Sequence, residues 1–151
     1  LYRRHRDQVY TLCLNMCGNR DEAQDLLQEA FVHVYRGLSR FAGRSSFTTW
    51  LYRIAVNVGR DASRRRRRAP DPAGWQAPPE PDLSTVENVR AVLGRLNPSH
   101  RLVLVLRYSQ FLTYRDIAEC LGWSLPRVKV TLHRAKRAFK EEYLRTGDTK
   151  P

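Results

Sequence analysis

Apolar residues recur at helical spacing through the first half of the chain. The first stripe consists of Val9, Leu12, Cys13 and Met16. It predicts an amphipathic helix over about residues 1–17, which Gly18 is expected to end. Asn19 can then cap a second helix, with Glu22 three residues on as in a capping box.

Two more helices are predicted in this half, over about 21–35 and from Phe47 to about Ser63, with a loop around 37–46 between them. Their apolar sides consist of Ala23, Leu26, Leu27, Ala30, Phe31 and Val34 in the first, and Trp50, Leu51, Ile54, Ala55 and Val58 in the second. The opposite sides are expected to face away from the core. They carry Asp25, Gln28, Glu29 and Val32 in the first helix and Thr49, Arg53, Val56, Asn57 and Arg60 in the second.

The second half also reads as helical, and no strand-like alternation persists in it. Ser84 and Glu87 predict a capping box before an apolar stripe made of Val86, Val89, Val92, Leu93 and Leu96. Asn97 and Pro98 then start a helix to about Tyr108, because proline is tolerated at the first helical position. The pattern therefore predicts an all-α fold.

The composition changes sharply once, between residues 69 and 82. This stretch, APDPAGWQAPPEPD, holds most of the eight prolines, and its charged residues are all acidic. Proline removes amide donors and disfavours helix at the residue before it, so an extended linker is predicted. We expect two small helical domains, over 1–68 and 84–151, joined by a proline-rich linker over 69–83 and free to move relative to each other.

The stretch from Thr113 to Lys140 has the spacing of a helix-turn-helix motif. Thr113 can cap a short helix over 114–121, Gly122 suits a tight turn, and Ser124 can cap the next helix. Small and apolar residues stand where the core of such a motif requires them: Ile117, Ala118, Leu121, Val128 and Leu132. The remaining face of the last helix is cationic, with Arg127, Lys129, His133, Arg134, Lys136, Arg137 and Lys140. That face suits the major groove, where Arg reads guanine edges; a membrane surface or another protein is the alternative.

Composition narrows the class of partner. Lys and Arg total 27 against 15 Asp and Glu, which gives a net charge of +12 and indicates a polyanionic partner. No run of about 18 apolar residues predicts a membrane span, and no signal peptide is evident, so a cytoplasmic location is expected. Cys13 and Cys17 could share a helix face as a metal or redox site, but burial in the core is favoured. No metal or other cofactor is expected.

A run of five arginines, Arg64–Arg68, follows the third predicted helix. Alone, such a run is usually a solvated segment with generic phosphate affinity. Here it continues the polar side of that helix, so one DNA-facing surface is predicted. Aromatic and cationic residues also interleave just before it, a pattern that suits single-stranded nucleic acid: Arg40, Phe41, Arg44, Phe47, Trp50, Tyr52 and Arg53. The alternative is that Phe47 and Trp50 are simply core residues, and for Trp50 the core is favoured.

Parts of the sequence are also compatible with two other functions. A helix-turn-helix regulator would need an effector pocket or a dimer interface, and residues 1–68 show neither. A metal-dependent nuclease could use Asp21, Glu22, Asp25 and Glu29, but acids at the start of a helix are favoured by its dipole in any case. No catalytic residue is therefore expected, and the chain is not predicted to be an enzyme.

The order of these features resembles the group 4, or extracytoplasmic-function (ECF), sigma factors of bacterial RNA polymerase. The strings GNRDEAQDLLQEAFVHVY and FTTWLYRIAVN resemble region 2 of that family, and LTYRDIAECLG with the basic helix after it resembles region 4. The resemblance implies that region 2 binds the clamp of the polymerase core's largest subunit and melts the promoter −10 element. It implies that region 4 reads the −35 element as duplex, and that an anti-sigma factor controls the chain in a stress or envelope response.

The resemblance also implies roles for single residues. Asp25, Gln28, Glu29 and Val32 would bind the polymerase. The −10 element would be bound by the loop residues Arg40, Phe41, Arg44, Ser45 and Ser46, which would capture a flipped base, and by Arg53, Asn57, Arg60 and Arg64. The −35 element would be bound by Arg107, Ser124, Arg127, Lys129, Val130, His133, Arg134 and Arg137. Pro126, Val130 and Thr131 depart from the family's common residues, so the promoter sequence is not implied.

Overall fold

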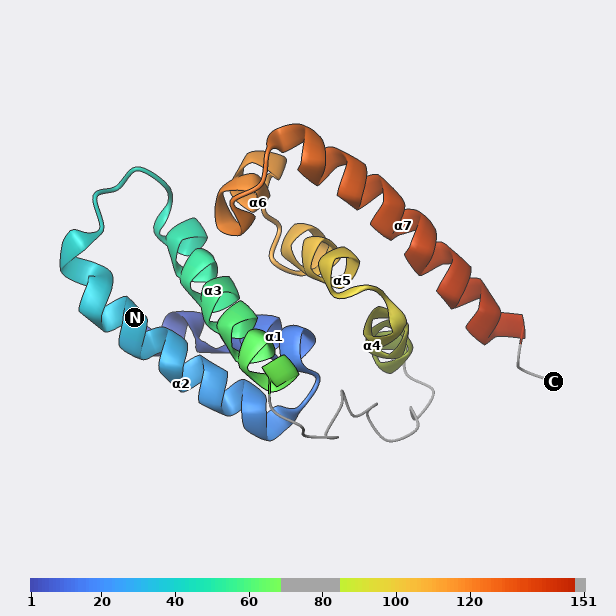
Figure 1. The fold of residues 1–151 in the computed structure, drawn as a ribbon, viewed down its shortest axis with the longest axis horizontal. Helices are drawn as coiled ribbons and strands as arrows, with labels where there is room; N and C mark the ends of the chain where they lie inside the picture. Colours follow the sequence, from blue (N-terminus) through green and yellow to red (C-terminus); the bar gives the residue numbers. More distant parts are fainter. Residues whose placement is uncertain (69–84, 149–151) are drawn as a thin grey trace.

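The computed structural model of the chain describes residues 1–68 and 85–148, and every regular element within these two ranges is helical (Figure 1). This confirms the all-α class. The N-terminal half, residues 1–68, contains α1 (Tyr2–Cys17), α2 (Arg20–Gly37), the 3₁₀ turn η1 (Leu38–Arg40) and α3 (Phe47–Arg68). The C-terminal half, residues 85–148, contains α4 (Thr85–Arg95), α5 (Pro98–Leu104), the π-helical turn η2 (Val105–Ser109), α6 (Tyr114–Leu121) and α7 (Leu125–Asp148). The expected linker over 69–83 and the Ser84 cap lie outside the described residues.

The N-terminal half is a three-helix bundle whose apolar stripes meet as predicted. All six apolar residues predicted for α2 are buried. Gly18 ends α1 in the left-handed conformation, at φ 71°, which glycine adopts without strain. The Oδ1 of Asn19 accepts from the amide of Glu22 at 3.1 Å, but the Glu22 carboxylate pairs with Arg66. Only one half of the predicted capping box therefore forms.

Helix α3 is longer than predicted, because it continues through the arginine run to Arg68 instead of ending near Ser63. Acidic residues compensate part of the charge of this last segment. Arg66 pairs with Glu22 on α2, and Arg65 lies 3.6 Å from Glu29 on the same helix. These ion pairs with the neighbouring helix offset the repulsion that a run of like charges would otherwise bring to a helix end.

The helix-turn-helix of the C-terminal half forms as predicted. Thr113 and Asp116 make a complete capping box at the start of α6, Gly122 takes φ 67° at its end, and the Ser124 hydroxyl accepts from the amide of Arg127 at 3.3 Å. The predicted core residues Ile117, Leu121, Val128 and Leu132 are buried. The α-helix from Pro98 is shorter than predicted, since it ends at Leu104 and continues as the π-helical turn.

The two halves pack against each other through α3 and α6, and we call this the closed arrangement (Figure 1). It makes one sequence prediction wrong, because Thr49 and Val56 of α3 are buried rather than exposed. The Cys120 thiol donates to the carbonyl of Thr49 at 3.4 Å. The Tyr52 hydroxyl donates to Oε1 of Gln110 at 2.7 Å. Both contacts join a residue of α3 to one of the C-terminal half.

Burial disfavours the thiolate form of the three cysteines. All are free and buried, and no group of three or more His, Cys, Asp or Glu gathers within the described ranges. Burial, then the neighbouring Cys17, raises the pKa of Cys13 to about 12, and burial, then Asp116 and Glu119, raises the pKa of Cys120 to about 12. The pKa of Cys17 is raised mainly by burial as well.

We therefore expect a thiol reagent to modify the folded chain far more slowly than the unfolded chain at pH 8. The thiolate is the reactive form, and a pKa of about 12, as for Cys13 and Cys120, lowers its fraction by about 1,000-fold relative to an ordinary thiol. The absorbance of the chromophore that the reagent releases measures the modification rate of the folded chain, and in guanidinium chloride that of the unfolded chain. Fast modification of one equivalent in the folded chain would contradict the burial of these thiols.

Candidate nucleic-acid and protein interfaces

Helix α7 presents an exposed cationic face. Its apolar residues Val128, Leu132 and Ala135 are buried against the rest of the motif, which fixes the rotation of the helix. The predicted readers on the other side are all exposed: Lys129, Val130, His133, Arg134 and Arg137. This rigid, solvent-facing helix can enter a major groove, and the 49% exposure of Val130 leaves an apolar contact for a thymine methyl group.

Three other predicted −35 residues serve the local structure as well. The guanidinium of Arg127 lies 4.0 Å from the ring centre of Trp123. Arg107 donates to the carbonyl of Leu112 at 2.9 Å and lies over the Tyr114 ring. Ser124 is exposed, and its hydroxyl caps α7. These contacts hold Arg107 and Arg127 in place, so any DNA contact they make would begin from ordered side chains.

The outer side of α2 forms a mixed acidic and apolar surface. Asp25, Gln28 and Val32 are exposed, whereas Glu29 is half-buried and lies 3.6 Å from Arg65 and 4.0 Å from His33. The sequence interpretation missed Tyr35, which is 57% exposed and stands three residues after Val32. Its helical spacing from Val32 was the available signal. An exposed apolar stripe beside acids on a cationic chain suits a protein partner.

The loop between η1 and α3 divides the predicted −10 residues into two kinds. Phe41 packs against Trp50 at 5.1 Å and against Phe47 at 5.8 Å between ring centres. The Ser46 hydroxyl accepts from the amide of Thr49 at 3.1 Å, so Ser46 caps α3. These two residues build the loop. The side chains left for a ligand are the exposed Arg40 and Arg44 and the half-buried Ser45.

A hollow of about 370 Å³ lies between α2 and α3. Arg40, Trp50 and Asn57 line it, which brings together a cation, an aromatic ring and an amide from the loop and from α3. Arg53 and Asn57 are both exposed on α3. These groups can stack on an unpaired base and bond to its edge.

Arg60 and Arg64 occupy a different part of α3. Arg60 is half-buried and donates to the carbonyl of Leu121, at the end of α6, at 3.1 Å. Arg64 is exposed and lies 3.3 Å from Asp61. The structure therefore does not gather all four predicted α3 residues on one free surface, since Arg60 contacts the C-terminal half in the closed arrangement.

A further exposed aromatic residue was missed in the sequence. Phe111 is 83% exposed and has φ 57°, a conformation that favours glycine or asparagine. It lies in the turn before α6, three residues after the half-exposed Tyr108. Backbone strain at an exposed side chain is common at functional sites. No sequence pattern could have found it, because the strain depends on the turn.

Two protein-family models match this chain. The model of sigma-70 region 2 matches residues 1–69, and the model of sigma-70 region 4 matches residues 92–141. Each predicted interface therefore falls inside a region that the family models describe. Within the described ranges, no helix is long and apolar enough to cross a membrane.

Curated proteins resemble nearly the whole chain. The RNA polymerase sigma factor YlaC of Bacillus subtilis is 34% identical over 98% of this chain and 92% of its own length. The ECF RNA polymerase sigma factor SigW of the same organism is 31% identical over 91% of this chain and 84% of its own.

Two solved structures share the fold. The sigma factor RpoE of Bartonella quintana, solved with the anti-sigma factor NepR, matches with a TM-score of 0.77 and 19% identity, covering 90% of this chain and 89% of that one. CnrH, solved with the cytosolic domain of CnrY, matches with a TM-score of 0.71 and 22% identity, covering 98% of this chain and 86% of that one.

Proposed function

This chain belongs to the ECF sigma factors of bacterial RNA polymerase, and we propose that its two halves read the −10 and −35 elements of one promoter while the polymerase core holds them apart. It is a transcription-initiation factor that binds core enzyme and promoter DNA, and not itself an enzyme. The observation that carries the residue-level proposal is the exposed cationic face of α7 on a complete helix-turn-helix. That face is available for duplex DNA without any rearrangement within the motif.

Polymerase binding is assigned to the outer side of α2, with Asp25, Gln28, Glu29 and Val32 against the clamp of the largest subunit. We add Tyr35, whose exposed ring continues the same stripe. Acids there would repel phosphate, so this surface suits a protein better than DNA. The link between Glu29 and Arg65 orders one carboxylate before the partner arrives.

Capture of a flipped −10 base is assigned to the hollow between α2 and α3. Trp50 supplies a stacking surface, and Arg40 and Asn57 supply donors at its rim. Arg44 and Ser45 complete the loop, and Arg53 faces the upstream edge of the melted segment. Phe41 and Ser46 act by holding the loop, through the aromatic cluster and the α3 cap.

Reading of the −35 duplex is assigned to α7. Lys129, Val130, His133 and Arg134 lie toward the N-terminal part of the helix, which normally lies deepest in the groove. Ser124, Arg127 and Arg137, with Arg107 from the turn before the motif, would hold the flanking backbone.

The closed arrangement must open for this function. The −10 and −35 elements are named by their positions, which lie about 25 base pairs apart. This separation is ~85 Å at ~3.4 Å per base pair. A compact chain of 151 residues has a radius of gyration of only ~15 Å. The closed chain cannot reach both elements, so contacts with core enzyme must replace the contacts between α3 and the C-terminal half.

Two further inferences rest on the relatives. Because RpoE, a solved sigma factor of this fold, is in complex with the anti-sigma factor NepR, we infer that an anti-sigma factor also controls this chain, in a stress or envelope response. We also infer that it acts in the cytoplasm, where its polymerase is, in keeping with the absence of a membrane-crossing helix from the described ranges.

Promoter binding is expected to require core polymerase, because the free chain is closed. Run-off transcription and promoter gel shifts, with and without core enzyme, measure this. The free chain should show only weak, salt-sensitive DNA binding. Tight sequence-specific binding by the free chain would instead support the alternative of a conventional helix-turn-helix regulator.

The substitution Asp25→Lys is expected to weaken core binding by about 2–5 kcal/mol if the charge is desolvated in the complex. A fluorescence titration of labelled chain with core enzyme gives the affinity. Asp7→Lys is the matched control, since Asp7 is an exposed acid on α1 and undergoes the same change of charge. Equal affinities for both variants would remove α2 from the core interface.

The substitution Arg134→Ala is expected to relax the preference at one −35 base pair, because loss of a bidentate Arg–guanine contact costs about 1–3 kcal/mol of discrimination. Lys140→Ala should weaken all promoters alike and reduce the salt slope by about 1. Holoenzymes that contain the wild-type chain, Arg134→Ala or Lys140→Ala are compared in transcription of a promoter library with single-base changes in the −35 element, which separates these effects. A uniform loss with Arg134→Ala, with the preference profile intact, would show that Arg134 is not a reader.

A further inference from the structure

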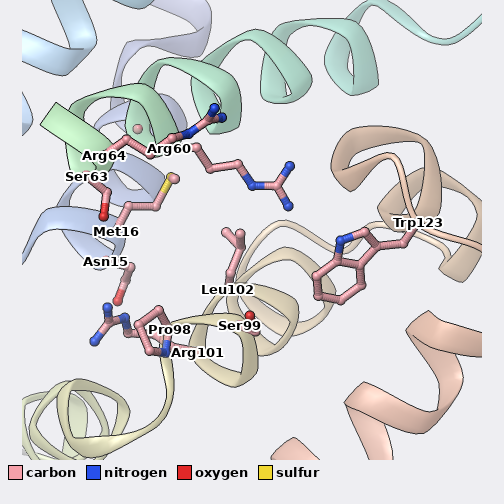
Figure 2. A pocket seen from close by; sticks show the side chains of 11 residues that line it. Asn15, Met16, Arg60, Ser63, Arg64, Pro98, Ser99, Arg101, Leu102 and Trp123 are labelled. Carbon is pink, nitrogen blue, oxygen red and sulfur yellow. The ribbon is translucent and has the colours of Figure 1, made fainter. Parts of the chain in front are cut away.

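Trp123 lies in the turn between α6 and α7, outside every surface assigned above to DNA or to polymerase. Its side chain is half-buried and packs against the hydrophobic core. With Leu102 of α5 it lines a cleft between the two halves (Figure 2). Its amide donates to the carbonyl of Ala118 at 3.0 Å, which fixes the backbone of the turn. The indole ring therefore occupies a defined place beside the start of α7.

The contact between Trp123 and Arg127 is the shortest cation–π contact among the described residues. The guanidinium carbon of Arg127 lies over the indole ring at 4.0 Å from its centre, whereas the other three cations lie 4.9 to 5.8 Å from their rings. Tryptophan is the side chain whose ring attracts a cation most strongly. Because Arg127 is exposed, its long side chain would otherwise sample many rotamers. The ring restricts that sampling.

The contact with Trp123 leaves the hydrogen-bond donors of Arg127 free. Across residues 1–68 and 85–148, the guanidinium of Arg127 makes no hydrogen bond and no ion pair. Arg107 differs, because its guanidinium donates to the carbonyl of Leu112. A ring beneath a guanidinium attracts the charge without accepting its N–H groups in the usual way. Arg127 is thus held in place and can still form a bidentate bond to a phosphate group.

Arg127 also has a fixed backbone. It is the third residue of α7, and its amide donates to the hydroxyl of Ser124 at 3.3 Å. It lies in the N-terminal part of the helix, which normally lies deepest in the groove. Both the backbone and the side chain are therefore ordered before DNA arrives, so less conformational entropy is lost when the contact forms.

We propose that Trp123 is a positioning residue for promoter recognition, which holds the guanidinium of Arg127 ready to bond a DNA phosphate at the edge of the −35 element. The proposal rests on the assignment of α7 to the −35 duplex. Trp123 acts through Arg127 and not through a DNA contact of its own. Because a phosphate contact carries no base information, Trp123 contributes affinity for all −35 sequences alike.

The position of the Arg127 side chain is tested by NMR on the full chain, without polymerase or DNA. A guanidinium over an aromatic ring has its Nε–H resonance displaced by the ring current, and loss of the signal in Arg127→Gln assigns it. We expect a displaced resonance in the wild-type chain and in Trp123→Phe, which keeps a ring. Trp123→Leu, which keeps apolar bulk but has no ring, should show an ordinary position. An undisplaced resonance in the wild-type chain would overturn the proposal, whether or not Trp123→Leu folds.

The consequence for promoter binding is measured on preassembled holoenzyme, by competition binding to the promoter that the −35 library selects. We expect Trp123→Leu to weaken binding about 3- to 10-fold without changing the −35 base preference, and Trp123→Phe to retain most of the affinity. Arg127→Gln should weaken binding and reduce the salt slope by about 1. Arg3→Gln removes an exposed charge from α1 and is the matched control, with unchanged affinity expected.

The double variant separates positioning from support of the fold. In the Arg127→Gln background, Trp123→Leu should cause no further loss, because a positioning residue acts only through its partner. An equal loss in both backgrounds would show that the ring supports the turn instead, and would overturn the proposal. A wild-type holoenzyme without any −35 dependence would contradict the assignment of α7 itself, and the NMR result distinguishes that failure from a failure of the contact between Trp123 and Arg127.

Discussion

The closed arrangement of the two halves depends on helix α3 being buried on two sides. Leu51, Ala55 and Val58 form one side, which packs into the N-terminal bundle, and Thr49 and Val56 form another, which is covered in the closed arrangement. A helix with one buried face would leave the halves independent. The second face brings the C-terminal half against the first. It creates the contact of Arg60 with α6 and a cleft of about 250 Å³ between the halves, lined by Arg60 and Trp123 among others (Figure 2).

The net charge of +12 is distributed unevenly, and this separates the surfaces by partner. Acids of α2 compensate the arginine run locally, through Glu22 with Arg66 and Glu29 with Arg65. Among the ion pairs of the described residues, none involves the reading face of α7, where Lys129, His133 and Arg134 face solvent. The uncompensated face suits phosphate-rich DNA, and the compensated one suits a protein.

Sequence reasoning succeeded where the determinants are local. The six buried residues of α2, the left-handed Gly18 and Gly122 and the Thr113 cap follow from spacing and from the chemistry of single residues. It failed where another part of the chain decides. Thr49 and Val56 read as exposed because the covering helix, α6, is some 60 residues away in the sequence. The extension of α3 to Arg68 depends on acids of α2.

The candidate site residues were predictable only in part. The exposed face of α7 was predictable from periodicity, but the roles of Phe41 and Ser46 in holding their loop depend on three-dimensional contacts.

The contact between the halves is suited to opening, because several of its bonds are polar. Tyr52 with Gln110, Arg60 with Leu121 and Cys120 with Thr49 are hydrogen bonds whose groups can bond to water once exposed. Each of the two neutral bonds contributes only about 0.5–1.5 kcal/mol net, and the bond from the charged Arg60 about 1.5–3 kcal/mol, so the three together contribute a few kcal/mol. A desolvated charge pair at a protein interface can be worth as much by itself. Contacts with core enzyme must therefore offset these bonds and also the apolar part of the seam, since buried residues of both halves belong to one hydrophobic cluster.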